Sequence, residues 1–210
     1  MKRALLITLA LISCFAAKAQ LPTIRPTHTF KVPNISHATY KSGTYFNEDN
    51  ELFWDLHCSD YTCNGESVVA SSSLSSQGSN SYRASNIKDW NHETAWVEGV
   101  SGFGIGEWIE FQNLSGDGRT FTAVTILNGY VKSDKAWSEN ARVKRLKVYR
   151  DGRPLCILEL QNSRSLQTFG LQWAGDCSHI NKLRFEILEV YPGTKYQDTV
   201  ISEIYFTAVP

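Results

Sequence analysis

Apolar and polar residues alternate with a period of two in most of the hydrophobic segments that follow residue 65. The segments Gly106 to Phe111 and Phe121 to Leu127 show this alternation, which is typical of a strand with one buried face. The segment Arg142 to Tyr149 follows the same pattern with a slip of one residue. The chain therefore predicts about eight short strands, at Ser67–Ser71, Gly106–Phe111, Phe121–Leu127, Arg142–Tyr149, Leu155–Leu160, Leu166–Phe169, Leu183–Val190 and Val200–Phe206.

The connections between these segments carry turn signals rather than helix signals. Asp151-Gly152 follows one strand directly, and glycine there accepts the positive φ that a tight hairpin turn requires. No amphipathic pattern extends over three helical turns, so the crossover helices that parallel sheets need are missing. The sequence predicts an all-β fold, an antiparallel β-sandwich of the jelly-roll type.

The first 19 residues have the three parts of a secretory signal peptide. Lys2-Arg3 forms a charged start, an apolar stretch follows, and Ala17-Lys18-Ala19 is a small-x-small cleavage site. The apolar stretch is shorter than the roughly 20 residues that span a bilayer. A second possibility is open, because Leu11 to Cys14 resembles a bacterial lipobox, which would make Cys14 a lipidated N-terminus. We expect an exported protein, secreted or periplasmic, with no membrane span.

After the signal, composition divides the chain into an arm and a domain. Residues 20–65 contain Pro22, Pro26 and Pro33 and little regular pattern. We expect them to form an extended N-terminal arm that packs onto the domain through Phe53 and Trp54. The strand pattern begins at residue 66, and residues 66–210 have the length of a single sandwich domain.

Four cysteines remain once the signal is removed, Cys58, Cys63, Cys156 and Cys177. An even number in an exported chain favours disulfides, and four cysteines permit three pairings. We expect the local pairs, since Cys58 and Cys63 flank a short turn and Cys156 and Cys177 bracket a hairpin. Zinc is the alternative, but it prefers two closely spaced cysteine pairs and only the first pair fits.

Charge makes nucleic acid an unsuitable partner. The full chain has 21 basic and 21 acidic residues, and loss of the signal removes three basic ones, which leaves a net charge of −3. Binding to a phosphate backbone requires a basic patch. The apolar fraction of 42% is that of an ordinary globular protein.

Several motifs together carry a family resemblance. The run Ala84 to Trp96 contains A-x-N-x-x-D-x-x-x-x-T-x-W, and later motifs continue it, namely WVEG (96–99), GIGEWIEF (104–111), NGY-x-K (128–132), N-x-R-V-K (140–144), VYPGTKYQDT (190–199) and ISEI (201–204). They resemble discoidin-like domains (coagulation-factor type C, galactose-binding-like), in particular the translocation domain found beside the enzyme in streptococcal NAD glycohydrolases. The resemblance covers about residues 66–210. It implies a jelly-roll glycan-binding module without the catalytic domain.

The same resemblance implies a structural calcium ion at the first motif. Calcium takes six to eight oxygen ligands from carboxylates, hydroxyls and carbonyls. Asp89 and Glu203 would supply carboxylates, Asn91 a carbonyl, and Thr94 its hydroxyl and carbonyl. The competing interpretation is that Asp89 only caps a turn and Glu203 lies on a solvated edge.

The residues themselves point to two loops for sugar binding, residues 129–141 and residues 191–198. Sugars pack on aromatic faces and hydrogen-bond to charged and amide groups, and these loops contain both kinds of side chain. Loops at one end of a sandwich converge. The candidates are Tyr130, Lys132, Trp137, Asn140 and Arg142 in and after the first loop, Tyr191, Lys195 and Tyr196 in the second, and Glu98 in a third. Arg142 has an alternative role, an ion pair with Asp198. We expect Trp96 and Trp108 in the core and Trp137 exposed to the ligand.

The sequence does not predict an enzyme. Carboxylates for glycoside hydrolysis are available at Glu98, Glu107, Glu110 and Asp198, but nothing in the sequence marks two of them as a catalytic pair. The motifs of serine hydrolases, zinc proteases and phosphate-binding loops are missing. The alternative to a glycan binder is a protein-interaction or surface-structural domain of the cell envelope, and a glycan-processing enzyme is a more remote alternative.

Overall fold

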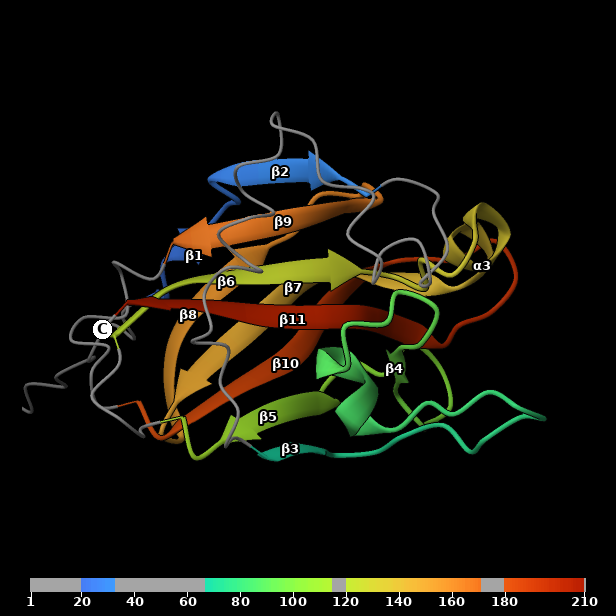
Figure 1. Ribbon diagram of the computed structural model, residues 1–210, viewed down its shortest axis with the longest axis horizontal. Coiled ribbons are helices and arrows are strands. Elements are labelled where there is room, and N and C mark those ends of the chain that lie inside the picture. Colours follow the sequence, from blue (N-terminus) through green and yellow to red (C-terminus); the bar gives the residue numbers. More distant parts are fainter. Residues whose placement is uncertain (1–19, 33–66, 115–119, 171–179, 210) are drawn as a thin grey trace, which may run out of the picture.

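The computed structural model describes residues 20–32, 67–114, 120–170 and 180–209. Its strands form two layers that enclose one core (Figure 1). One layer contains, in spatial order, β1 (Thr23–Ile24), β8 (Arg153–Glu159), β7 (Ala141–Arg150), β10 (Lys182–Tyr191), β5 (Trp108–Gln112) and β3 (Ser67–Ala70). The other contains β2 (His28–Lys31), β9 (Ser165–Gly170), β6 (Thr120–Asn128), β11 (Thr199–Val209) and β4 (Trp96–Val97). The predicted all-β, mainly antiparallel sandwich is confirmed.

One pairing joins the two layers at the end where β11 begins. Thr199 and Val200 pair in parallel with Ala141 and Arg142 at the start of β7. Because these strands start side by side, the loops that precede them are also brought to the same end of the sandwich. Those are the two loops in which the sequence places most of the candidate ligand-binding residues.

All eight predicted strands are present, although their ends differ by a few residues from the prediction. The expected turn also forms, with φ of 48° at Asp151 and 80° at Gly152, as a tight hairpin turn with two left-handed central residues requires. The sequence pattern missed the short strands β1, β2 and β4. It also missed two short helices, η1 (Ala84–Lys88) and α3 (Asp134–Glu139).

The slip in the alternation of β7 is a β-bulge. Opposite this strand, consecutive residues Glu189 and Val190 of β10 pair with Arg145 and Val143, so one residue of β7 is left over. The bulge restores the alternation, and the apolar side chains on both sides of it point into the core.

Part of the predicted arm belongs to the sandwich. β1 pairs with β8 and β2 pairs with β9, so each adds a strand at one edge of a layer. Ile24 packs against the main core cluster, and Phe30 packs against a second cluster around Leu127. The signal peptide and the contacts predicted for Phe53 and Trp54 lie outside the described residues. Within the described ranges, no helix has the length and apolar character needed to cross a membrane.

Apolar side chains of both layers meet in the core. Phe111 lies edge to face with Phe185 of its own layer and with Phe206 of the other, at centroid distances of 6.1 and 4.9 Å. Trp96 is fully buried, as predicted, and its indole N–H donates to the carbonyl oxygen of Ser72 (2.9 Å).

The prediction that Trp108 belongs to the core is wrong. Ile109 and Phe111 of β5 point into the core, so strand alternation places Trp108 on the outer face. There its half-buried ring lies under the guanidinium of Arg184, whose central carbon is 4.0 Å from the ring centroid.

The predicted Cys156–Cys177 disulfide stays a prediction, because Cys177 lies outside the described residues. Cys156 is a free cysteine whose side chain is fully buried within the core cluster. Burial raises the pKa of its thiol to about 12. Cys177, Cys58 and Cys63 lie outside the described residues, so the Cys58–Cys63 pair stays a prediction.

Candidate functional site

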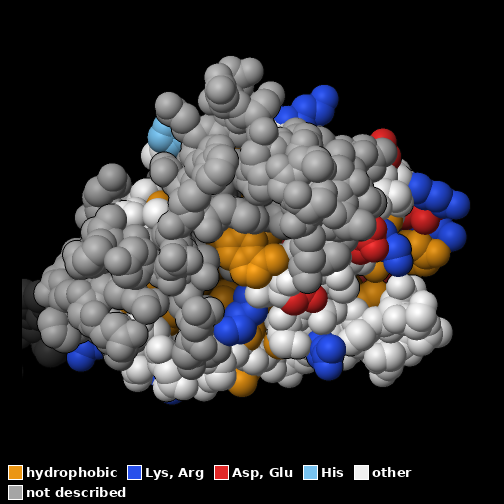
Figure 2. Space-filling model, in the orientation of Figure 1, with side chains coloured by type: hydrophobic (Ala, Val, Ile, Leu, Met, Phe, Trp, Pro, Cys, Tyr) orange, Lys and Arg blue, Asp and Glu red, His pale blue; other side chains and the backbone are white. Residues whose placement is uncertain are grey.

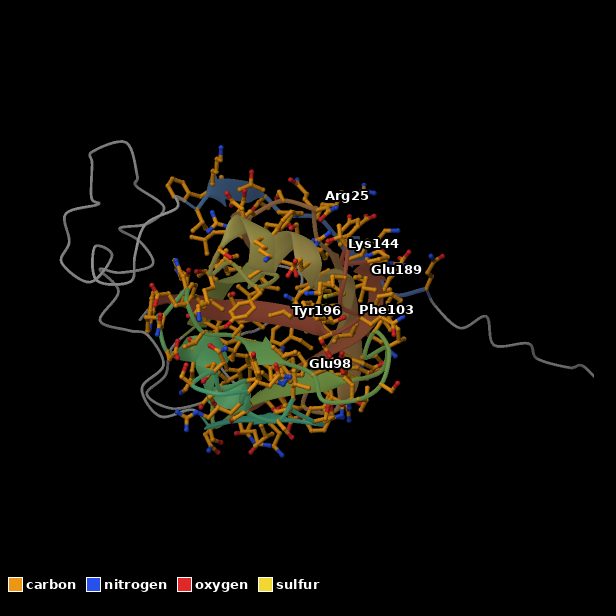
Figure 3. All side chains as sticks on the ribbon, turned by 90° about the vertical axis from the view of Figure 1, so that its right-hand side faces the viewer. Arg25, Glu98, Phe103, Lys144, Glu189 and Tyr196 are labelled. Atoms are coloured by element: carbon orange, nitrogen blue, oxygen red, sulfur yellow. The ribbon has the colours of Figure 1, made fainter. Side chains whose placement is uncertain are left out.

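The loop before β11 is fastened to the end of helix α3. The carbonyl oxygen of Glu139 accepts hydrogen bonds from the backbone N–H groups of Lys195 (3.1 Å) and Tyr196 (2.8 Å). Gly193 permits the close approach, because a Cβ there would lie 2.3 Å from the same carbonyl oxygen. Figure 3 views this end of the sandwich, with Tyr196 near its centre. The backbone around Tyr196 is thus held in place against α3.

Beside Tyr196 the surface forms a hollow of about 290 Å³, here called the tyrosine hollow. Its lining combines three tyrosines with amide and carboxylate groups, Leu74, Gln77, Tyr82, Val97, Tyr130, Ala136, Glu139, Asn140, Tyr196 and Asp198. Tyr196 is 40% exposed and offers its ring to a ligand. A hollow that combines flat apolar faces with a few polar groups can bind a small polar ligand.

Tyr130 forms the inner wall of the tyrosine hollow. Its ring lies nearly perpendicular to that of Tyr82, with the centroids 6.4 Å apart. Burial is the main reason that the pKa of the Tyr130 phenol rises to about 12, with smaller contributions from Tyr82 and Glu93. The wall therefore presents a neutral phenol over the physiological pH range.

Tyr130 also borders a second, more polar hollow of about 260 Å³. Lys132 lines it and donates from its ammonium to Oδ1 of Asn80 (3.1 Å). Of the residues predicted to bind ligand, Tyr130, Asn140 and Tyr196 line the tyrosine hollow, whereas Lys132 lines the second one. Lys195 stands beside the ring of Tyr196, 4.7 Å from its centroid, and does not line either hollow.

Glu98 was predicted to contact the ligand, and the structure corrects this. It is fully buried, and its carboxylate accepts from the backbone N–H groups of Thr199 (3.1 Å) and Val100 (2.9 Å). Burial raises its pKa despite these two hydrogen bonds. Gly104 packs directly on its side chain. Glu98 therefore holds the glycine-rich loop against the start of β11 and is not available to a ligand.

Arg142 and Trp137 are also structural, contrary to prediction. Arg142 is 6% exposed and donates to the carbonyl oxygens of Trp137 (2.8 Å), Asn140 (2.9 Å) and Pro192 (3.3 Å). Its guanidinium lies 4.3 Å from the Trp137 ring centroid. That ring is half-buried and donates to the carbonyl oxygen of Asn128 (3.1 Å). Through these hydrogen bonds the pair connects the backbone at Asn128, Asn140 and Pro192. It does not line the tyrosine hollow.

Tyr191 was also predicted to contact the ligand, but it lines neither hollow. It is the final residue of β10, and its hydroxyl donates to the carbonyl oxygen of Leu160 (3.0 Å). The Lys144 ammonium lies 5.9 Å from its ring and bonds to Glu189 (2.7 Å). Figure 3 places Lys144 and Glu189 together and away from Tyr196.

Tyr82 and Glu139 were not among the residues predicted to bind a ligand, and Asp198 was expected only as an ion-pair partner of Arg142 or as an available carboxylate. Tyr82 comes from the serine-rich loop, Glu139 from the end of α3, and Asp198 from the residue before β11. Asp198 and Glu139 lie in the two loops that were predicted to bind sugar. Their positions in the sequence could therefore have identified them as candidate site residues. No pattern around Tyr82 indicated the end of the sandwich to which it folds.

The other carboxylates considered for hydrolysis have structural partners. Glu107 accepts from the hydroxyls of Ser71 (2.6 Å) and Ser72. Glu110 pairs with the guanidinium of Arg184 at 2.9 Å on the outer face of the sheet. Neither residue lines the tyrosine hollow.

The loop from Asp89 to Thr94 concentrates oxygen atoms beside β11. The Thr94 hydroxyl lies within hydrogen-bond distance of both Asp89 carboxylate oxygens (2.9 and 2.8 Å) and of the Asn91 carbonyl oxygen (2.8 Å). One backbone N–H, that of Asn91, serves both Asp89 (3.0 Å) and Glu203 (2.9 Å). In these contacts the oxygen acceptors outnumber the two donors, the Thr94 hydroxyl and the Asn91 N–H.

Glu203 adds a further acceptor that lacks a donor. It is fully buried, and its Oε2 has no hydrogen-bond partner among the residues that the structure describes. Burial first, and then the neighbouring Asp89 charge, raise its pKa well above the usual value. Within the described ranges, no group of three or more His, Cys, Asp or Glu side chains is placed to hold a metal ion by itself. An oxygen-rich site with a partnerless buried carboxylate oxygen fits a hard cation such as Ca²⁺.

Comparison with known proteins agrees with this architecture. A family model described as the NAD glycohydrolase translocation F5/8 type C domain matches residues 60–207. A solved fragment of a protein described as a chitobiase from Bacteroides thetaiotaomicron is similar, with a TM-score of 0.51 and 14% identity, over 70% of this chain and 90% of that one. An F5/8 type C domain from Bacteroides fragilis has a TM-score of 0.49 and 14% identity, over 69% and 93%.

A mycobacterial arabinofuranosyltransferase is also similar, with a TM-score of 0.47 and 17% identity, over 68% of this chain but only 11% of that one. No curated protein matches the sequence. At these identities the solved structures show the fold alone, whereas the family model covers well over half of the chain. The chain therefore belongs to the family of NAD glycohydrolase translocation F5/8 type C domains.

Proposed function

We propose that this protein is an exported, non-catalytic glycan-binding module whose ligand occupies the tyrosine hollow. F5/8 type C domains are typically carbohydrate-binding or accessory modules, and the family match supports the same role here. The observation that carries the proposal is the convergence of Tyr82, Tyr130 and Tyr196 with amide and carboxylate groups around one hollow. Such a lining provides stacking faces for sugar rings and hydrogen-bond partners for their hydroxyls.

A glycan screen followed by titration of two tyrosine variants tests this proposal. We expect Tyr196→Ala to weaken binding by about tenfold or more, because an aromatic side chain that contacts the ligand is often a hot spot. Tyr149→Ala is the matched control, since Tyr149 lies on the outer face of β7 and bonds to Glu186. The bound glycan should be recovered without cleavage.

Two outcomes would contradict the proposal. If no glycan binds and an envelope protein is captured through the same end of the sandwich, the protein is an interaction domain. If the glycan is cleaved, and Asp198→Asn abolishes the cleavage, it is a glycan-processing enzyme.

We also propose that Asp89, Asn91, Thr94 and Glu203 hold a structural Ca²⁺ ion. The excess of acceptors in this loop and the partnerless Oε2 of Glu203 support it. A bound ion would satisfy these oxygens and fix the loop beside the second hollow, which Asp89 and Asn91 also line.

Thermal unfolding with and without a chelator tests the ion. Binding to the folded state alone stabilises by about 2.7 kcal/mol at a hundredfold excess over Kd, so the chelator should lower the Tm. Asp89→Asn should abolish the difference, whereas the exposed Asp134→Asn should retain it. An unchanged melting curve in the wild type would show that hydrogen bonds alone hold the loop.

Export is the third part of the proposal and rests on the predicted signal peptide of residues 1–19. Cell fractionation should find the protein outside the cytoplasm with Gln20 at its N-terminus. Loss of the membrane-attached form on Cys14→Ala would instead identify a lipoprotein.

A further inference from the structure

We propose that the tyrosine hollow selects sugars that carry a free ammonium group over N-acetylated or carboxylated ones. This inference rests on the proposed glycan-binding function and names its ligand class. Among the described residues that line the hollow, Glu139 and Asp198 have carboxylate side chains, and no Lys or Arg is present. A ligand in this position meets negative charge and aromatic faces, which together favour a cation.

Two basic residues that contact this end of the sandwich, Arg142 and Lys135, do not line the hollow. Arg142 is buried beneath it and donates to three carbonyl oxygens. Lys135 is 80% exposed and lies 4.0 Å from Glu139, a distance at which an exposed pair contributes little. Acidic and basic side chains lie close together around α3 in Figure 2, so the selectivity arises from the lining of the hollow and not from the surrounding surface.

Lys195 shows within the protein itself that this position accepts an ammonium group. Its Nζ lies 4.7 Å from the centroid of the Tyr196 ring, and Lys195 is an exposed residue. The hydrogen bond to Tyr196, and to a lesser extent the Glu139 charge, raise the pKa of this lysine. A ligand ammonium would meet the same ring and the same carboxylate from inside the hollow, in competition with Lys195.

Asp198 is fixed in a position to contribute. Its carbonyl oxygen accepts from the backbone N–H of Ala141 (3.0 Å), at the junction of β7 and β11. The Asp198 charge is also felt by the buried Glu98, whose pKa it helps to raise. The backbone of Asp198 is therefore held at this junction, and its carboxylate adds negative charge to the lining of the hollow.

The test is calorimetric titration of the full mature chain with a β-1,4-linked glucosamine tetramer, its fully N-acetylated counterpart and a tetragalacturonate. We expect the glucosamine tetramer to bind about tenfold tighter than the other two and to weaken with added salt. Asp198→Asn should remove about tenfold of that preference. Lys195→Ala should strengthen glucosamine binding, because it removes the competing ammonium.

Glu189→Gln serves as the control, since it removes a carboxylate on a different face. Equal or tighter binding of the N-acetylated tetramer, or no effect of Asp198→Asn, overturns the charge selectivity while the glycan-binding function stands. If none of the three binds and the glycan screen is also negative, the proposed function itself fails.

Discussion

At the scale of single residues, Arg142 shows how a side chain predicted to bind ligand builds the site instead. Its guanidinium donates to three loop carbonyls and to Oδ1 of Asn162 (2.9 Å), and it stacks on Trp137. Lysine cannot reproduce this planar set of donors. We therefore expect Arg142→Lys to lower the free energy of unfolding by about 2–4 kcal/mol, through lost hydrogen bonds to buried carbonyls.

The matched control is the same substitution three residues further along the same strand. The guanidinium of Arg145 lies 3.9 Å from the Glu189 carboxylate, and both side chains are partly exposed, so their ion pair is weak. Arg145→Lys should therefore change the free energy of unfolding by less than about 0.5 kcal/mol. Denaturant unfolding of both variants measures the difference. Equal stability of the two variants would mean that the Arg142 contacts are dispensable.

Tyr130 leads to a prediction at alkaline pH. Its pKa is raised from 10.0 to about 12, so the folded state binds the phenolic proton more tightly than the unfolded state. The resulting contribution to stability is fully present below pH about 10 and is lost as the pH rises through about 12. Spectroscopic titration of the tyrosines should show one that ionises late, and Tyr130→Phe should remove it.

The control for this titration is Tyr196→Phe, because Tyr196 is exposed at the rim of the hollow. It should leave the late ionisation in place. If Tyr130→Phe leaves the late-ionising group unchanged, the burial described for Tyr130 is wrong.

At the scale of elements, β8 determines the chemistry of Cys156. From Leu155 onward the strand alternates between half-buried and buried positions, and Cys156 falls on the buried face with Leu158. Burial raises the pKa of its thiol to about 12, so almost no thiolate forms at neutral pH. We predict that Cys156 resists alkylation in the folded protein and reacts fully on unfolding.

Peptide mapping of the Cys156-containing fragment measures this reaction directly. β8 lies between β1 and the central strand β7. The rate of Cys156 alkylation should therefore follow the global unfolding of the protein more closely than the local fraying of strand ends. Rapid labelling under native conditions, or recovery of Cys156 in a disulfide without any labelling, would contradict the prediction.

At the scale of the whole molecule, the arm protects the edges of the sandwich. β1 and β2 cover the outer sides of β8 and β9, whose backbone groups would otherwise be free to pair with another chain. We predict that a variant lacking residues 20–31 has a lower Tm and associates at high concentration. Light scattering and thermal unfolding measure the two effects.

A milder variant separates packing from edge protection. Phe30→Ala removes an anchor of β2 and should cost about 1–3 kcal/mol, since Phe30 is only partly buried, without causing association. If the truncated protein remains monomeric with an unchanged Tm, the arm does not contribute to the stability of the sandwich.

The fold was largely predictable because strand alternation is a local property of the sequence. The core residues of β7 and the turn at Asp151-Gly152 follow from period-two patterns and from glycine's tolerance of positive φ. The short strands β1, β2 and β4 were not predictable in this way. Two to four residues carry too little pattern, and their pairing partners lie far away in the sequence.

By itself, the sequence determined the sandwich and located the two loops that meet at one end of it. It could not determine which side chains in those loops face outward. Trp137, Arg142 and Glu98 have the chemistry of ligand contacts. In the structure, however, these side chains hydrogen-bond to backbone carbonyl and N–H groups of the protein itself. Tertiary structure decided the site, because the parallel pairing of β7 with β11 brings Glu139 and Asp198 together. Tyr82 reaches the same hollow from a third segment, where its carbonyl oxygen accepts from the backbone N–H of Val97 in β4. Long-range pairing of this kind leaves no periodic trace in the sequence, since each segment contributes only one or two residues.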